Sequence, residues 1–426
     1  MIIILFVIMF TLIGVGMSIW VSMGLSGLLY VLIRGDVSLR LVASQMVNGV
    51  SADTLLAIPF FILAGNLMGS SGITNKLLKF SNFFVGKYRA GLAYVSIVTS
   101  VFLAGVSGSA VSDASSTSAV LHPIMKGRGY DDAYGASINA SSAVIGPIIP
   151  PSIPMVNVGI ISGISIGKLF LGGYIPGMLM ALSLWILVTI VAKKRNYPAA
   201  HVERSWKIFL SLVKETWLAL LAPVIIIIGV VSGLVTITEV AVLANAYILL
   251  ISVFVYKSIN LKNFFETVKN TAVFCCSIMM IFAAVGLFQY IVSSEQLGQQ
   301  LMNLILDLHM TKTGFLMFCT VFFLFMGCII DAVPVILIFF PVLLPIAIQL
   351  GVDPVHFGVI TVLNLMIGLI TPPVGALLFI ETKIAKIDIN ILIKEIWPHI
   401  IVLVGVLLLI TFVPWFVTFL PNLLFS

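Results

Sequence analysis

Apolar runs broken by short polar segments dominate the pattern of this chain. About 20 apolar residues suffice to cross a bilayer as a helix, and charged residues mark where such a helix ends. Charged and turn-forming residues separate the apolar runs here. The pattern predicts ten membrane segments, near residues 2–15, 16–33, 54–70, 133–165, 170–192, 216–232, 238–256, 271–292, 355–380 and 396–420.

Two further apolar stretches, about 91–123 and 314–346, are interrupted near the middle by small polar residues or prolines. Each of them also carries an aspartate close to the interruption. Backbone can turn at membrane depth only where protein buries it or where it lines a cavity. We therefore expect each stretch to form a re-entrant helical hairpin and not one long span.

Composition narrows the class of protein. Of the 426 residues, 61% are hydrophobic and 9% are charged, whereas soluble domains carry roughly 25% charged residues. Such a chain cannot cover a soluble fold with polar surface, which excludes a soluble enzyme, a disordered chain and a nucleic-acid-binding protein. We expect an all-α polytopic membrane protein. The four cysteines lie in apolar runs and the five histidines lack metal-ligand spacing, so neither set predicts a metal site.

Basic residues are distributed unevenly along this pattern. With the N-terminus placed outside, 18 lysines and arginines, Arg204 among them, fall in inside loops and only 4 fall in outside loops. Cytoplasmic loops carry such an excess, so we expect a periplasmic N-terminus. The first hairpin then enters from the cytoplasm and the second from the periplasm. Residues 1–13 lack the basic start and cleavage site of a signal peptide, so we expect a retained first span.

Parts of the chain recur after 222 residues. Residues 122–131 match 344–353, and residues 145–152 match 367–374. The hairpin acids Asp113 and Asp331 lie 218 residues apart, so pairing them requires a short gap. Five spans plus a hairpin in each half make an odd number of crossings, which inverts the second half in the membrane.

Inverted repeats of this kind are typical of secondary transporters. We expect a first repeat at 1–215 and a second at 216–426. Amphipathic stretches at 38–49 and 261–269 occupy matching places in the two halves. We expect both to be helices that lie in the plane of the membrane interface.

The interruption of the first hairpin is rich in small and hydroxyl residues. Residues 105–118 read Gly-Val-Ser-Gly-Ser-Ala-Val-Ser-Asp-Ala-Ser-Ser-Thr-Ser. Small residues allow a tight turn, while hydroxyl oxygens and the Asp113 carboxylate are ligands that a hard cation such as sodium prefers. Close helix packing through small residues is the alternative. A carboxylate in mid-membrane is costly, which favours an ion site.

Paired prolines interrupt two of the long spans. Residues 145–152 read Ile-Gly-Pro-Ile-Ile-Pro-Pro-Ser, and Gly-x-x-x-Pro-Pro recurs at 368–373. Proline lacks the amide donor, so each helix must break and leave carbonyls for a cation and helix N-terminal amides for an anion. A simple proline kink is the alternative, but the recurrence argues against chance.

The second hairpin, at 326–334, has few hydroxyl groups, so Asp331 stands nearly alone and could bind a cation, the substrate or a proton. Asn364 and Thr371 are possible partners for Asp331, and ordinary interhelical hydrogen bonding by these two residues remains open. Glu239 follows Thr236 at the spacing of a helix capping box, which we favour over an ion-binding role.

These motifs, together with Pro-Phe-Phe-Ile-Leu-Ala-Gly-Asn at 59–66 and Thr-Glu at 238–239, resemble the large membrane subunit of tripartite ATP-independent periplasmic (TRAP) transporters. The likeness covers the whole chain and is greatest to the sialic-acid branch. It implies an elevator-type ion transporter fold with scaffold and transport domains. It also implies sodium-driven uptake of a carboxylated organic acid, such as N-acetylneuraminate, across the bacterial inner membrane. The implied partners are a periplasmic substrate-binding protein and a separate small four-span membrane subunit.

The resemblance further implies at least two sodium ions and their ligands. For the first ion the implied ligands are the side chains or carbonyls of Ser107, Ser109, Asp113, Gly146, Pro150 and Ser152. For the second they are Gly327, Asp331, Gly368, Thr371 and Pro372. The substrate is expected between the hairpin tips, in contact with Ser109, Asp331 and Ser152.

Other functions stay open at this point. They include TRAP uptake of a C4-dicarboxylate or another organic acid, and a stand-alone dicarboxylate or citrate symporter that needs no binding protein. An intramembrane aspartyl protease using Asp113 and Asp331 is a rival from another class. Neither aspartate has the Gly-x-Gly-Asp sequence expected for that chemistry, which disfavours the protease.

Overall fold

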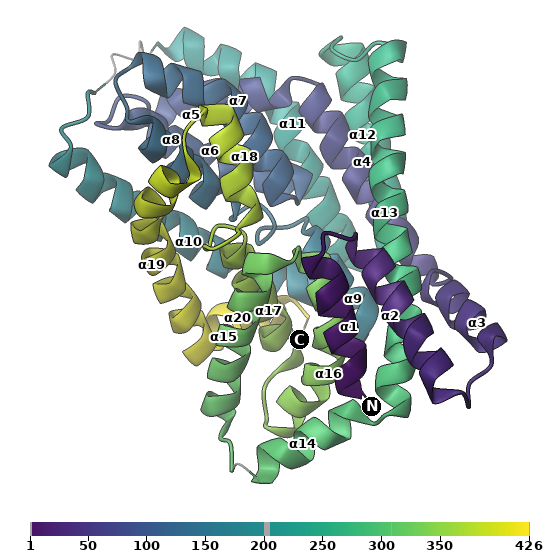
Figure 1. Ribbon diagram of the computed structural model, residues 1–426. Helices are drawn as coiled ribbons and strands as arrows, with labels where there is room; N and C mark the ends of the chain where they lie inside the picture. Colours follow the sequence, from purple (N-terminus) through teal and green to yellow (C-terminus); the bar gives the residue numbers. More distant parts are fainter. Residues whose placement is uncertain (1, 200–204, 308, 426) are drawn as a thin grey trace.

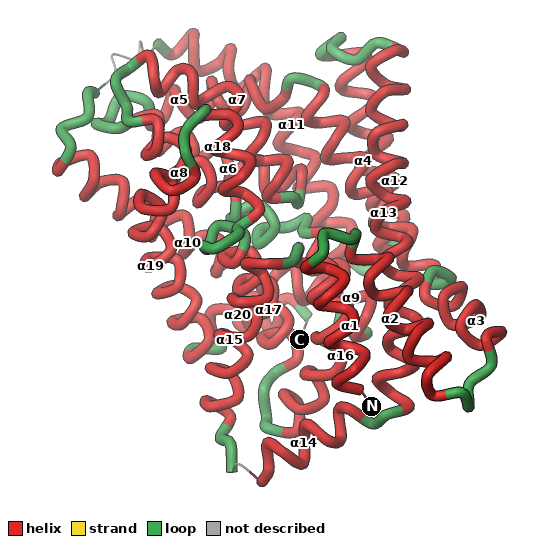
Figure 2. The backbone as a smooth tube through the Cα atoms, in the orientation of Figure 1, coloured by secondary structure: helices red, strands yellow, loops and turns green. Residues whose placement is uncertain are grey.

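The chain folds into helices that run in several directions around a central layer of loops (Figures 1 and 2). The computed structural model describes residues 2–199, 205–307 and 309–425, so Arg204 of the inside set lies outside the described residues. Within these ranges, the only strand-like pairing is one bridge between Arg89 and Ala199. Eight of the described helices are long and apolar enough to cross a membrane. The predicted all-α membrane class is confirmed.

Seven helices pack together as one unit, which we call the scaffold module. Its members are α1 (Ile2–Gly14), α2 (Ile19–Arg34), α3 (Leu39–Gly49), α4 (Ala57–Ser70, preceded by the 3-10 turn Asp53–Leu56), α11 (Trp206–Ser232), α12 (Ile237–Leu250, extended by the π turn Ile251–Val255) and α13 (Leu261–Ser294). Helix α13 packs against α2, α3 and α4, and α12 packs against α4 and α11. At one end, Tyr30 and Arg34 of α2 bind Glu295 at 2.5 and 2.7 Å, which fixes α2 to the end of α13.

The remaining long helices form a second unit, the hairpin module, which holds both predicted hairpins and both predicted breaks. Its members are α6 (Gly91–Ser107), α7 (Ala110–Gly127), α8 (Asp132–Ala143), α9 (Ile153–Ser162), α10 (Ile166–Lys194), α15 (Lys312–Ile329), α16 (Ala332–Gln349), α17 (Pro354–Gly368), α18 (Ala376–Ala385), α19 (Ile389–Phe412) and α20 (Trp415–Leu424). Hairpin 1 (α6–α7) and hairpin 2 (α15–α16) lie in opposite halves of the molecule in Figure 1. The helix-turn-helix form of both hairpins is confirmed.

Two short helices link the modules. Helix α5 (Ile73–Val85) leads from α4 to hairpin 1, and α14 (Leu297–Asp307) leads from α13 to hairpin 2. Both follow a 222-residue spacing to within a few residues, and both are amphipathic. The sequence analysis missed them because their polar residues were interpreted as loops between spans.

Two predictions about local structure are wrong. Residues 261–269 are not a separate interfacial helix, since they form the first turns of the 34-residue helix α13. Glycine and proline are both missing from this helix until Gly286, so nothing in the sequence breaks it there. The span predicted at 396–420 is two helices, α19 and α20, because Pro414 lacks the amide that would continue the first.

The helices of the two halves follow one another in the same order, which the hairpin tips show most clearly. Ser109 is the N-cap of α7 and Asp331 is the N-cap of α16, and these positions are 222 residues apart. Asp331 therefore corresponds to Ser109, and the predicted pairing of Asp331 with Asp113 through a gap is wrong. The repeat boundaries at 215 and 216, the inversion in the membrane and the periplasmic N-terminus remain predictions.

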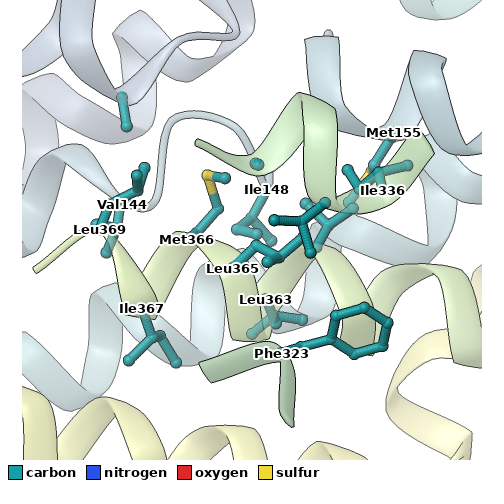
Figure 3. Close-up of a cluster of buried hydrophobic side chains, with 14 of the residues drawn as sticks. Val144, Ile148, Met155, Phe323, Ile336, Leu363, Leu365, Met366, Ile367 and Leu369 are labelled. Carbon is teal, nitrogen blue, oxygen red and sulfur yellow. The ribbon is translucent and has the colours of Figure 1, made fainter. Parts of the chain in front are cut away.

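An apolar core joins both broken helices to hairpin 2. Figure 3 shows Ile148 and Met155 from the first broken segment grouped with Leu365 and Met366 of α17, and all four are buried. Lipid is as apolar as these side chains, so close packing holds membrane helices together more than exclusion from water does. Such packing fixes the two breaks relative to one another.

Candidate functional site

The tip of hairpin 1 is pressed against the first helix break. Gly108 has φ +59°, and a Cβ built there would lie 2.5 Å from the carbonyl oxygen of Pro151. Only glycine fits this position without strain. The next residue, Ser109, caps α7 by accepting a hydrogen bond from the Ser112 amide at 3.4 Å. The tip therefore ends in a helix N-terminus that faces the break.

Asp113 lies one turn behind this tip. Its side chain is 1% exposed, and the Ser107 hydroxyl donates a hydrogen bond to Oδ1. Oδ2 is buried and has no hydrogen-bond partner among the described residues. A Cβ built on Gly146 would lie 2.3 Å from that oxygen, so Asp113 rests directly on the backbone of the first break. A partnerless carboxylate oxygen beside backbone carbonyls fits a small cation.

The first break supplies backbone groups more than side chains. The Ser152 hydroxyl donates to the Pro147 carbonyl and accepts from the Met155 amide at 3.2 Å, so it caps α9. Ser152 and Pro150 are buried within the loop. The Pro150–Pro151 peptide bond is cis, as is Pro372–Pro373 in the second break. Of the implied first ligand set, the structure brings Ser107, Asp113 and Gly146 together at one point.

Hairpin 2 meets the second break through glycine. A Cβ on Gly368 would lie 2.7 Å from the Cα of Gly327, so the two backbones touch. Thr371 donates its hydroxyl to Ile367 at 2.8 Å within its own segment, and Pro372 follows it in the loop. No described hydrogen bond connects Asp331 with this group.

Asp331 has a different environment from Asp113. Its Oδ1 accepts from the Val333 amide at 3.1 Å and thereby caps α16, while the side chain remains exposed. Asn364, which the sequence suggested as a partner of Asp331, donates to Ile360 of its own helix at 2.7 Å. The ordinary hydrogen-bonding role of Asn364 and Thr371 is therefore the one that the structure shows.

A cavity of about 370 Å³ lies between the two hairpin tips and the scaffold module. Ser109 and Asp331 line it, as predicted for substrate contacts, whereas Ser152 does not. The N-terminal turns of α7, α9 and α16 all contribute to its wall, and no lysine, arginine or histidine does. Helix N-termini attract anions. The cavity can therefore receive a carboxylate without a basic side chain.

The scaffold side of this cavity was missed by sequence reasoning. Asn66 of α4 and Phe274 and Ile278 of α13 line it, and Asn66 donates to Thr271 at 2.9 Å. The motif at 59–66 contained Asn66, but only the fold shows that α4 faces the hairpin tips.

Glu381 is a buried acid that the sequence analysis also missed. It is 0% exposed on α18, and Ser118 of α7 donates to its Oε1 at 2.5 Å. An acid within an apolar segment was the signal that identified Asp113, and it applied equally to Glu381.

A polar cluster lies at the end of α10, outside the spans. Arg195 binds Asp131 at 3.0 Å and Glu395 at 2.7 Å, and the Tyr197 hydroxyl donates to Asp131 at 2.8 Å. Burial, together with the neighbouring Asp131 carboxylate, raises the pKa of Tyr197 to about 12 despite the opposing effect of Arg195. The predicted capping box is confirmed nearer the middle of the chain, where Thr236 and Glu239 exchange hydrogen bonds at the start of α12.

Residues 6–416 match the family model described as the tripartite ATP-independent periplasmic transporter, DctM component. The chain belongs to this family. As a TRAP permease it is a transporter subunit and not an enzyme, which removes the protease alternative. The predicted family is confirmed.

Relatives within the TRAP family carry several substrate names. The chain is 36% identical to the sialic acid TRAP transporter large permease protein SiaM of Vibrio cholerae, over 96% of this chain and 95% of SiaM. It is 35% identical to the sialic acid permease SiaT of Haemophilus influenzae, over 98% of this chain and 67% of SiaT. It is 34% identical to the C4-dicarboxylate permease DctM of Pseudomonas aeruginosa, over 94% of each.

Among solved structures, the fold is similar to that of the Alcanivorax borkumensis YdaH transporter. The TM-score is 0.65 at 13% identity, and the match covers 88% of each chain. This likeness concerns the fold alone.

Proposed function

We propose that this TRAP permease carries out sodium-coupled uptake of a carboxylated organic acid, most specifically sialic acid, across the bacterial inner membrane. The acid would be delivered by a periplasmic binding protein, and a small four-span membrane subunit would complete the transporter. The N-terminus would be periplasmic. The naming of two relatives for sialic acid supports the substrate, and the distribution of basic residues supports the orientation.

The observation that carries the proposal is the cavity between the hairpin tips. Asp113 lies just behind its wall with a partnerless oxygen against Gly146, and Asp331 lies on the wall itself. The first group therefore fits a sodium ion, held by Asp113, Ser107 and carbonyls of the first break. The second group, Gly327, Gly368, Thr371 and Pro372, would contribute backbone oxygens near Asp331. A cation at Asp331 would also offset the repulsion between this carboxylate and an anionic substrate.

The interface between the two modules supports an elevator-like movement. Among the described residues, one side-chain hydrogen bond crosses it, from Gln289 of α13 to the Leu337 carbonyl of α16 at 3.5 Å. Aromatic and small residues supply other contacts: Phe6 stacks on Phe339 at 5.9 Å, and Gly65 lies against Ser107. An interface with so few directional bonds has little to break when one module slides past the other. Helices α5 and α14 would act as the connecting arms.

Charge balance sets the driving force. Two sodium ions moving inward with one monoanionic acid carry one net positive charge. A membrane potential of 100 mV then contributes about 2.3 kcal/mol. A tenfold sodium gradient adds about 1.4 kcal/mol for each ion. Uptake should therefore generate current and accumulate the acid.

The test is uptake into proteoliposomes that contain this chain, the small subunit and an acid-loaded binding protein. A sodium gradient should drive accumulation of labelled N-acetylneuraminate above that of C4-dicarboxylates, isethionate and 2,3-diketogulonate. Uptake of another acid from this panel would replace the substrate while leaving the mechanism intact. Uptake by the chain alone, without the binding protein, would refute the tripartite reading in favour of a stand-alone symporter.

A further inference from the structure

Glu381 is a buried carboxyl group to which the proposed sodium sites assign no role. It joins α18 of the second half of the chain to α7 of the first, through the 2.5 Å hydrogen bond from Ser118. Its other oxygen, Oε2, is buried without any partner among the described residues. The neighbouring Thr117 hydroxyl on α7 is likewise buried and without a partner. The pair therefore lies in a polar pocket that is closed to solvent.

No counter-charge accompanies this carboxyl group. Helix α18 packs against α7, α8 and α19, and none of the charged groups on these helices forms a described ion pair with Glu381. Lys126 is engaged with Asp132 at 2.7 Å, and His122 lies 3.3 Å from the same Asp132. The titratable groups on these helices and on α18 itself are Asp113, His122, Lys126, Asp132, Tyr134, Lys394, Glu395, His399 and Lys383.

An ionised Glu381 would thus be desolvated on both oxygens and compensated by a single hydroxyl. A neutral carboxylic acid in the same place would forgo only one hydrogen bond, at Oε2. Leaving a full charge buried is much the costlier of the two. A neutral Glu381 also leaves Asp113, five residues from Ser118 on α7 and about 7.5 Å away along the helix axis, as the charged group nearest the first break.

We propose that Glu381 binds a proton, so that the hairpin module carries a hydrogen-ion site separate from its two sodium sites. The proton resides on the carboxyl group that joins α7 to α18, and it keeps the contact between the two halves electrically neutral. The inference rests on the membrane placement of these helices and not on sodium coupling or on the identity of the substrate.

Infrared difference spectroscopy of the purified chain in lipid nanodiscs tests the site directly. A protonated carboxylic acid has a carbonyl band that is distinct from the carboxylate bands and shifts in D2O. Subtracting the spectrum of Glu381→Gln from that of the unmodified chain at pH 7 should leave such a band, equivalent to one group. Glu395→Gln is the matched control: Glu395 is an acid of the same module paired with Arg195 at 2.7 Å, so its subtraction should leave carboxylate bands.

Ser118→Ala provides a second measurement that keeps the acid in place. Loss of the Ser118 hydrogen bond should move the Glu381 carbonyl band without removing it. Carboxylate bands in the Glu381→Gln subtraction, or bands that respond to sodium and not to D2O, would overturn the proton assignment. Because no transport is measured, a failure here is distinguishable from a failure of sodium-driven uptake.

Discussion

Replacing Asp113 by asparagine is the most direct test of the first cation site. The substitution keeps the shape of the side chain and removes its charge. In the folded chain, Ser107 supplies the one hydrogen bond to this carboxylate, and Oδ2 meets no donor among the described residues. A bound cation would therefore provide most of the compensation for the buried charge.

The magnitude follows from that geometry. Removing one partner of a buried charge pair costs about 3–5 kcal/mol, and each 1.4 kcal/mol is tenfold in affinity. We expect Asp113→Asn to weaken sodium binding at this site by at least about 100-fold. In the absence of sodium the variant should be no less stable than the unmodified chain, because the removed charge was uncompensated.

Thermal unfolding in detergent, with and without sodium, separates these effects. An ion present at 100 times its dissociation constant stabilises the folded chain by about 2.7 kcal/mol. Sodium should therefore raise the unfolding temperature of the unmodified chain by several degrees, with choline as the ionic-strength control. Asp113→Asn should lose most of that rise, while Glu395→Gln should keep it. An undiminished sodium-dependent rise in Asp113→Asn would show that this carboxylate holds no sodium.

Four further outcomes are expected. Gly146→Ala places a methyl group 2.3 Å from Asp113 Oδ2 and should also abolish the sodium-dependent rise in unfolding temperature, whereas Gly127→Ala, whose Cβ meets nothing within 4 Å, should preserve it. Asp331→Asn should raise the half-saturating concentrations of both sodium and the acid in proteoliposome uptake, because Asp331 lines the cavity; a change in sodium alone would place the substrate elsewhere. Stability should fall between pH 10 and about 12 as the unfolded chain, but not the folded one, loses the Tyr197 proton, and the unfolding temperature of Tyr197→Phe should lack this alkaline decline. Glu239→Ala removes half of the capping box of α12 and should cost about 0.5–2 kcal/mol of unfolding free energy without altering the sodium-dependent rise; no measurable loss would mean that the box contributes nothing to folding.

The features that sequence predicted well are those with local causes. Gly108 and Ser109 turn hairpin 1, and the paired prolines break both long helices, because each acts on its own few residues of backbone. The missed helices α5 and α14 are amphipathic, so their hydropathy resembles that of a loop, and their existence depends on the modules that they join. Similarly, nothing local reveals that Glu381 meets Ser118, since 263 residues separate them and only tertiary packing brings them together.

The corrected register also explains why the two sites differ. At the shared N-cap position the first half carries a hydroxyl, Ser109, and the second a carboxylate, Asp331. The first half instead places its carboxylate, Asp113, one turn deeper, where Gly146 closes over it and the cavity does not reach it. A cation at Asp113 would therefore organise the tip and the break without touching the substrate, whereas a cation at Asp331 would share the cavity with the acid. Two nearly symmetric tips thus acquire separate chemical roles through the position of one carboxylate relative to the start of its helix.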